Sequence, residues 1–304
     1  MASPVESAEG SALRGFLAEE MGEELKVGRE PAGEGNEDCK RRHYTRPNGE
    51  VYVGRSVPRN EAGVRDDVEL FRALREVRIF PRLLSAPGTG KTSAIEASFG
   101  SELITVVCAE GTDEDTLVGG YRPRPDWEWV DGLVTKALRE DRPLLLDEFA
   151  AAHPRVQSRL NGVFDGRLEL VLSERDGEVV RAGRKFWAAV AYNPGPELQL
   201  SAAMESRFSL PIRYRTDYRV AREIGVPDRV VRLAKRLERM VGAGEASWSP
   251  QMRELVAFRR HAELLGERWA VGALVGAAPE GCEEEVAAAC AEVFRDVPAR
   301  PLEL

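Results

Sequence analysis

The chain has 304 residues, 43% of them hydrophobic, and a formal net charge of −8. This length predicts one large domain or two smaller ones, each able to bury its own core. The acidic balance argues against non-specific binding to nucleic acid or anionic membranes, although a local basic channel in an assembled ring would escape this argument. No apolar stretch is long enough to cross a bilayer, and the N-terminus lacks a secretory pattern, so we expect a cytoplasmic protein.

The first part of the chain changes character near residue 45. Residues 1–45 are rich in Glu, Gly and Ser, and we interpret them as a flexible acidic arm. The next residues predict a small hairpin that turns at Asn48-Gly49, followed by a helix over 64–77.

From Arg82 onward, apolar strands alternate with helices, which predicts a parallel, three-layer α/β core over 46–219. A second hairpin is expected to turn at Asp176-Gly177. The expected strands are 82–86, 103–109, 143–149, 186–194 and 210–215, and the expected helices are 91–99, 133–139 and 156–164.

Beyond the last expected strand, the remaining residues have helical spacing only. We therefore predict a small all-α lid domain over 220–304. Its expected helices are 226–241, 250–266, 267–277 and 283–297.

The strongest signal for chemistry is the segment SAPGTGKT, which joins a buried strand to a helix. Gly88 and Gly90 allow the backbone to curl so that successive N–H groups point at phosphate oxygens. Lys91 can bridge the β- and γ-phosphates of ATP, and the Thr92 hydroxyl can bind Mg²⁺. The residues expected to hold the nucleotide here are Ser85, Ala86, Pro87, Gly88, Thr89, Gly90, Lys91, Thr92 and Ser93.

Ser85 is a departure from the usual loop, which has glycine at this position. Serine is small, so we expect binding to survive if the backbone avoids positive φ at this residue.

A second signal for chemistry is the segment PLLLDE, an apolar strand that ends in Asp147 and Glu148. Carboxylates at the carboxyl ends of parallel strands lie where ligands bind in such folds. Downstream of a phosphate loop, we expect Asp147 to hold Mg²⁺ together with Thr92, and Glu148 to activate the attacking water.

Three further polar residues have ambiguous roles when each is judged alone. Asn193 ends another buried strand and could contact the γ-phosphate, but Asn-Pro is also a good turn pair. Arg207 could stabilise transition-state charge in a neighbouring subunit, or could be an ordinary surface arginine. Arg253 begins a helix of the second domain and could reach back to the nucleotide.

Taken together, these motifs resemble AAA+ ATPases, in which SAPGTGKT, LLLDEF, AYNP, ESRF and SPQMR have counterparts in this order. The finer wording is similar to the MoxR branch, especially its CbbQ/NorQ-like members, over about residues 50–265. The resemblance implies that Asn193 is sensor 1, Arg207 the arginine finger and Arg253 sensor 2. The apolar residues 149–152 depart from the family, which puts a second inter-subunit arginine in doubt and leaves Arg155 and Arg159 as candidates.

The resemblance also implies a homo-oligomeric ring, commonly a hexamer, that hydrolyses ATP to remodel or activate a partner protein. Such partners often carry a von Willebrand factor A domain. Tyr121, Trp127 and Trp129 lie in an expected loop, where they either grip a protein client or pack beneath the loop. Two alternatives stay open: a nucleotide-dependent scaffold with little hydrolysis, and a DNA-associated motor.

Overall fold

The computed structural model describes residues 41–195 and 198–303. Most of the predicted acidic arm therefore lies outside the described residues. The predicted first hairpin is confirmed: β1 (His43–Thr45) pairs antiparallel with β2 (Val51–Val53), and Gly49 turns between them with φ 81°. Strand β1 includes the last residues that the sequence assigned to the arm.

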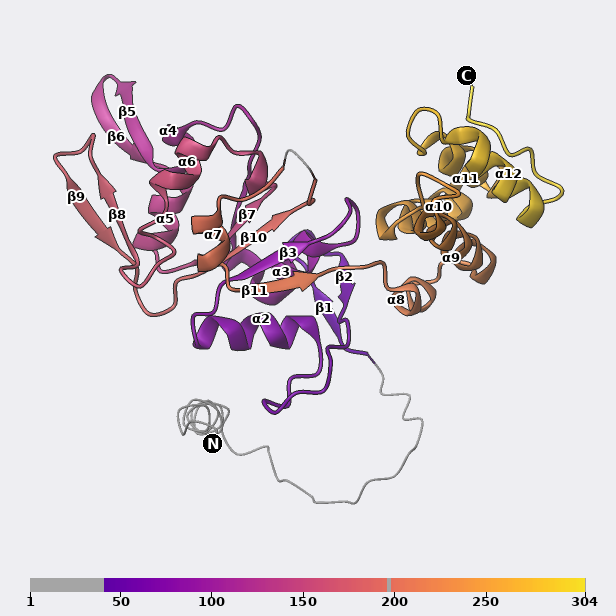
Figure 1. Ribbon diagram of the computed structural model, residues 1–304, viewed down its shortest axis with the longest axis horizontal. Helices are drawn as coiled ribbons and strands as arrows, with labels where there is room; N and C mark the ends of the chain where they lie inside the picture. The colour runs from indigo at the N-terminus through magenta and orange to yellow at the C-terminus, as the bar shows by residue number, and fades with distance from the viewer. Residues whose placement is uncertain (1–40, 196–197, 304) are drawn as a thin grey trace, which may run out of the picture.

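A five-stranded parallel sheet forms the centre of the core, with strand order β11-β3-β10-β7-β4. Helices α2 and α3 pack together on one face and α5 covers the other, which confirms the predicted three-layer α/β arrangement (Figure 1). The strands are β3 (Pro81–Leu84), β4 (Ile104–Val107), β7 (Pro143–Asp147), β10 (Trp187–Tyr192) and β11 (Leu210–Arg213). The helices are α2 (Asp67–Glu76), α3 (Lys91–Phe99) and α5 (Leu133–Arg139).

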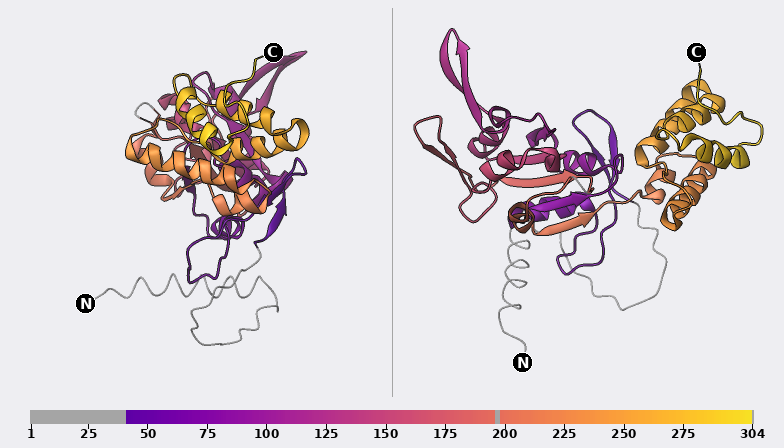
Figure 2. Two further views of the ribbon diagram at one scale, coloured as in Figure 1. Left: turned by 90° about the vertical axis from the view of Figure 1, so that its right-hand side faces the viewer. Right: turned by 45° about the horizontal axis from the view of Figure 1, so that its top comes forward.

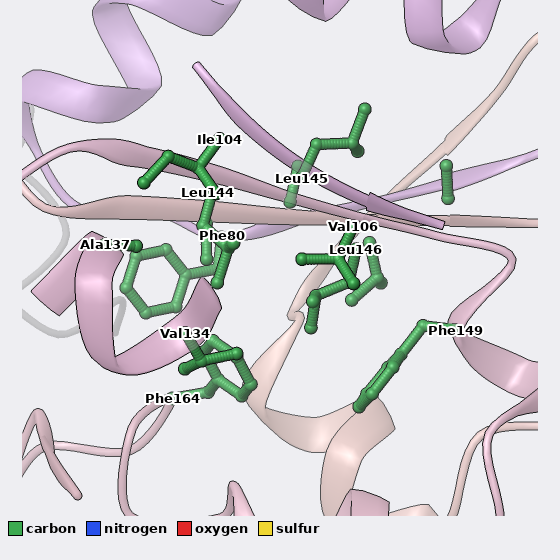
Figure 3. Close-up of a cluster of buried hydrophobic side chains, with 14 of the residues drawn as sticks. Phe80, Ile104, Val106, Val134, Ala137, Leu144, Leu145, Leu146, Phe149 and Phe164 are labelled. Atoms are coloured by element: carbon green, nitrogen blue, oxygen red, sulfur yellow. The ribbon is translucent and has the colours of Figure 1, made fainter. Parts of the chain in front are cut away.

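The central strands are apolar along their length because helices cover both faces of the sheet. In β7, Leu144 and Leu146 point toward α5, whereas Leu145 points to the opposite face (Figure 3). All three leucine side chains are fully buried. This packing fixes the carboxyl end of β7, where the polar residues of the site begin.

Short elements connect the core strands. They are α4 (Glu114–Leu117), α6 (Pro154–Arg159), α7 (Ala202–Arg207) and two 3₁₀ turns, Gly100–Glu102 and Phe149–Ala151. The predicted helix over 156–164 is wrong in its second half, because the chain leaves the helix at Leu160 and turns through Asn161-Gly162.

Two hairpins project from the end of the core opposite the helical lid (Figure 2). The hairpin of β8 (Glu169–Leu172) and β9 (Glu178–Arg181) turns at Asp176-Gly177, as predicted. The expectation of a loop over 121–129 is wrong, since β5 (Gly119–Arg124) and β6 (Asp126–Asp131) form a second hairpin.

The C-terminal part is all-helical, as predicted, and has its own buried apolar cluster that includes Leu233, Leu255, Phe258 and Leu274. Val53 of β2 belongs to this cluster, so the first hairpin also packs against the lid. No helix among the described residues is both long and apolar enough to cross a membrane. The lid helices are α8 (Tyr218–Glu223), α9 (Asp228–Ala243), α10 (Met252–Leu265), α11 (Glu267–Gly276) and α12 (Glu283–Val293).

Candidate functional site

A cleft of about 1150 Å³ lies between the sheet and the lid. This volume is ample for a drug-sized ligand, for which pockets are typically about 300–1,000 Å³. Its floor is the segment from Pro87 to Ser93, and its walls come from the β1–β2 hairpin and from helices α8 and α10. Asp147 and Glu148 also line it.

The predicted phosphate loop, residues 85–92, leaves β3 and enters α3. Gly88 and Gly90 have φ values of 78° and 94°, a region where a side chain would be strained. Ser85 is not among the described residues with positive φ, so its side chain is accommodated in a conformation open to any residue. The backbone at Ser85 thus avoids positive φ, which is the condition under which we expect serine to be compatible with phosphate binding.

Lys91 is buried at the start of α3 and forms the centre of a hydrogen-bond chain. Its Nζ donates to Ser85 Oγ at 2.9 Å and to Asn193 Oδ1 at 2.8 Å. The Asn193 amide in turn donates to Glu148 Oε1 at 2.9 Å. The chain arises because β10, which ends beside Asn193, lies between β3 and β7.

A second pair lies beside this chain, where the Thr92 hydroxyl donates to Asp147 Oδ2 at 2.7 Å. Burial lowers the pKa of the Lys91 ammonium, and the facing carboxylates of Glu148 and Asp147 oppose that shift. Glu148 itself has a left-handed backbone with φ 53°, a strained conformation of the kind found at functional sites. The structure therefore brings together the five polar side chains that the sequence assigned to phosphate, metal and water.

The observed groups fit a magnesium nucleotide. No side chain of the described residues caps the first turn of α3, which leaves its N–H groups and positive dipole end available to an anion. The described residues hold no cluster of three or more His, Cys, Asp or Glu side chains suited to a metal. Mg²⁺ commonly needs only one or two protein oxygens when phosphates complete its shell, and Thr92 and Asp147 offer such a pair.

The lid reaches the loop directly at Arg253, near the start of α10. The Arg253 backbone N–H donates to the Gly88 carbonyl at 3.0 Å, and its side chain is exposed at the cleft. A capping box between Gln251 and Glu254 fixes this end of the helix. The sequence predicts that Arg253 could reach back to a nucleotide, and the structure places Arg253 at the lining of the cleft.

Arg207 does not line the cleft. Its Nε donates to the Asn161 carbonyl at 3.1 Å and its Nη1 to the Ala203 carbonyl at 2.6 Å. Of the two other candidate arginines, Arg159 pairs with Glu114 and Glu174 within its own subunit, whereas Arg155 is exposed.

The three aromatic residues of the β5–β6 hairpin have different environments. Tyr121 and Trp127 are 43% and 70% exposed. Trp129 packs against the core, its ring is edge-on to Tyr121, and its indole N–H donates to Asp131 at 2.7 Å. Only Trp129 therefore has the packing role that the sequence left open.

Sequence reasoning missed the contribution of the segment before the phosphate loop. Tyr52, Val53 and Arg55 line the cleft, and so do Arg259 and Arg260 of α10. The run VYVGR predicts only the second half of a hairpin, and no motif in it points to a ligand.

A family model described as an AAA domain of the dynein-related subfamily matches residues 83–208. The chain is similar to protein CbbQ of Hydrogenophilus thermoluteolus, with 36% identity over 149 residues, which cover 47% of this chain and 55% of CbbQ. It is 32% identical over 194 residues to protein NorQ of Paracoccus denitrificans, covering 58% of this chain and 71% of NorQ. Denitrification regulatory protein NirQ of Pseudomonas aeruginosa is 30% identical over 175 residues, covering 53% of this chain and 66% of NirQ.

These similarities agree with the fold and with the placement of the phosphate loop between β3 and α3. The matched family region runs from β3 to the end of α7 and so contains the loop, Asp147, Glu148 and Asn193. The chain belongs to the MoxR-like AAA+ ATPases, in the group that includes CbbQ and NorQ.

Proposed function

We propose that this chain binds Mg²⁺-ATP in the cleft and hydrolyses it within a ring, and that it uses the cycle to remodel or activate a partner protein. The observation that carries the proposal is the hydrogen-bond chain from Lys91 through Asn193 to Glu148, beside the Thr92–Asp147 pair. The test is Mg²⁺-dependent ATP turnover by the purified protein, with the Glu148→Gln variant as the background.

Each residue of this hydrogen-bond chain has a role that its position supports. Lys91 contacts the β- and γ-phosphates, and Asn193 holds Glu148 toward the γ-phosphate. Glu148 accepts a proton from the attacking water as general base. Thr92 and Asp147 would hold Mg²⁺, which would supply positive charge to neutralise the phosphates.

The apolar part of the cleft suits the nucleotide base. Val53 of the β1–β2 hairpin lines it, together with Ile224, Met252 and Val256 of the lid. A flat purine between these side chains would bury apolar surface from both the hairpin and the lid. Binding would then bring lid and core together.

Arg207 does not line the cleft of its own subunit, so in the proposed assembly it would act in the cleft of a neighbouring subunit. A guanidinium at a subunit edge can stabilise transition-state charge in the neighbouring site. We therefore place Arg207 at the interface of a homo-oligomeric ring, most simply a hexamer, in which each subunit completes the site of the next.

Arg207→Ala is expected to lower turnover about a thousandfold or more while each subunit still binds ATP, because an arginine finger acts only in the transition state. Mixing Arg207→Ala with Lys91→Ala protein should restore part of the activity, since an intact loop then meets an intact arginine. The measurement is steady-state ATPase of each variant and of the mixture.

The surface variant Arg65→Ala, whose side chain is 63% exposed, serves as the control and should retain activity. A mixture that stays as inactive as its components would contradict action between subunits.

The partner is proposed to be a protein, in line with the name of the relative NirQ, a denitrification regulatory protein. Trp127 and Tyr121 offer exposed aromatic surface at the projecting β5–β6 hairpin, where they could hold a client. A partner with a von Willebrand factor A domain fits the same proposal.

One observation favours a second candidate, a scaffold that hydrolyses ATP slowly. Lys91 donates to Ser85 Oγ at 2.9 Å, a bond that glycine could not accept and that competes with phosphate for the ammonium.

Ser85→Ala removes this acceptor without changing the backbone, so we expect turnover and ATP affinity within about fivefold of the parent protein. Steady-state kinetics measures both quantities. A rise in turnover of about tenfold or more would instead favour the scaffold and identify Ser85 as its brake.

A further inference from the structure

Arg55 links the phosphate loop to the entrance of the helical lid. It follows β2, and its Nη2 donates to the carbonyl oxygen of Thr89 inside the loop. Its Nη1 donates to the carbonyl oxygen of Arg215 at 3.0 Å, in the segment between β11 and α8. The guanidinium lies over the Tyr214 ring, 4.9 Å from the centroid. One side chain thus joins the phosphate loop to the segment that leads into the lid.

The contact with Thr89 affects the direction of a neighbouring N–H group. The Thr89 carbonyl and the Gly90 N–H belong to one planar peptide unit and point in opposite directions. Holding the carbonyl toward Arg55 therefore holds the Gly90 N–H toward the other side of the loop. A Cβ added to Gly90 would meet Arg55 Nη2 at 3.0 Å, which shows how closely the guanidinium packs against this peptide.

The contact with Arg215 lies next to a second link between lid and loop. The Thr216 hydroxyl donates to Gln251 Oε1 at 2.6 Å, and Gln251 is the N-cap of α10. Two residues later, the Arg253 N–H donates to the Gly88 carbonyl. Successive carbonyls of the loop, at Gly88 and Thr89, are therefore held by the lid helix and by Arg55.

The backbone of Arg55 is itself anchored in a buried cluster. Its N–H donates to Asp67 Oδ1 at 3.0 Å, and the hydroxyls of Tyr52 and Tyr214 both donate to Asp67 Oδ2. Burial raises the pKa of each tyrosine well above the usual tyrosine value, so both hydroxyls keep the protons that they donate. The guanidinium therefore extends from a rigid base.

We propose that Arg55 is a positioning residue that couples ATP binding in the phosphate loop to movement of the helical lid. The inference rests on the proposed ATP site. A guanidinium suits the task because its planar fork donates in two directions at once, whereas a lysine ammonium is a single point of charge. When the loop closes on phosphate, the Thr89 carbonyl and the Arg215 carbonyl move as one unit.

The experiment compares the parent chain with Arg55→Ala, Arg55→Lys and a matched control, Arg72→Ala. Arg72 also donates to a backbone carbonyl, that of Ser98, and lies over a tyrosine ring, that of Tyr44, but it does not line the cleft. Binding of Mg²⁺-ATP is measured by calorimetry. Hydrogen exchange of residues 214–219 with and without ATP reports on the entrance to the lid.

Arg55→Ala should weaken ATP binding about tenfold or more, because the charge-assisted hydrogen bond to the Thr89 carbonyl of the loop is lost. It should also abolish the protection of 214–219 that ATP confers on the parent, while Arg72→Ala retains both. Arg55→Lys should recover only part of the affinity and none of the protection.

Full recovery by Arg55→Lys would show that charge alone matters and would overturn the bridging role. Equal losses in Arg72→Ala, or an unchanged affinity and protection in Arg55→Ala, would overturn it too. If Arg55→Ala fails to fold, the ATP affinity and exchange protection of Arg55→Lys alone test the bridging role. A parent protein that binds no ATP would instead refute the proposed function.

Discussion

Lys91→Ala is expected to abolish measurable ATP binding, with a loss of affinity of roughly 10²–10⁴-fold. Lys91 is buried at the N-terminus of α3. In the proposed complex its ammonium makes two charge-assisted hydrogen bonds to phosphate oxygens, each worth about 1.5–3 kcal/mol. Calorimetric titration with Mg²⁺-ATP measures the effect directly. The rise in melting temperature that ATP gives the parent should disappear as well.

The fold should survive this change. Because burial lowers the pKa of Lys91, the charged form is less favourable in the folded chain than in the unfolded chain. Removing the ammonium relieves that cost at every pH at which an unfolded lysine is protonated, which offsets the lost bonds to Ser85 and Asn193. We expect a melting temperature close to that of the parent when nucleotide is absent.

The exposed Lys136 provides the matched control, since its side chain is 48% exposed and pairs only loosely with Glu140. Lys136→Ala should bind ATP like the parent. Tight ATP binding by Lys91→Ala would contradict the assignment of the loop.

Most individual elements were predictable because their periodicity is local. The helices Lys91–Phe99 and Leu133–Arg139 have the bounds that the sequence predicts. The order of the strands was not predictable, since buried parallel strands are uniformly apolar and do not encode their neighbours. That order is what sets Asn193 between Lys91 and Glu148.

The β5–β6 hairpin was missed for a physical reason. Pro123 and Pro125 argue against a strand in a larger sheet, because proline cannot donate to a ladder. In a two-stranded ribbon every strand is an edge, so proline is tolerated. The register pairs Tyr121 with Trp129 and Pro123 with Trp127, which gathers these side chains on one face.

Arg55 was beyond sequence reasoning because its contacts are set by tertiary structure. Its two acceptors lie 34 and 160 residues away along the chain. Nothing in the local run VYVGR distinguishes this arginine from a surface residue. The motif residues Lys91, Asp147 and Glu148 could be found because their spacing to strand and helix is local.

Glu148→Gln is expected to lower turnover by about 10²–10⁴-fold while ATP still binds, because only the general base is lost. Glutamine has nearly the same shape, and its side-chain oxygen can accept the Asn193 amide hydrogen bond as Glu148 Oε1 does at 2.9 Å. Lys91 and Thr92, which contact phosphate and Mg²⁺ in the proposal, are untouched. Single-turnover hydrolysis and nucleotide binding are measured on the same preparation.

Hydrolysis-deficient protein should also keep ATP bound long enough to trap the assembly, so size-exclusion chromatography in Mg²⁺-ATP should show a larger species than in ADP. Glu102→Gln, at an exposed glutamate paired with Arg75, is the control and should turn over ATP normally. If Glu148→Gln hydrolyses ATP at the parental rate, Glu148 is not the base. If instead the parent never exceeds the Glu148→Gln rate, with or without candidate partners, the proposal of ATP hydrolysis is wrong. The second candidate, a nucleotide-dependent scaffold, would then be favoured. The geometry favours Glu148 as the base, since Glu148 lines the cleft and its Oε1 accepts a hydrogen bond from Asn193, which itself accepts one from Lys91.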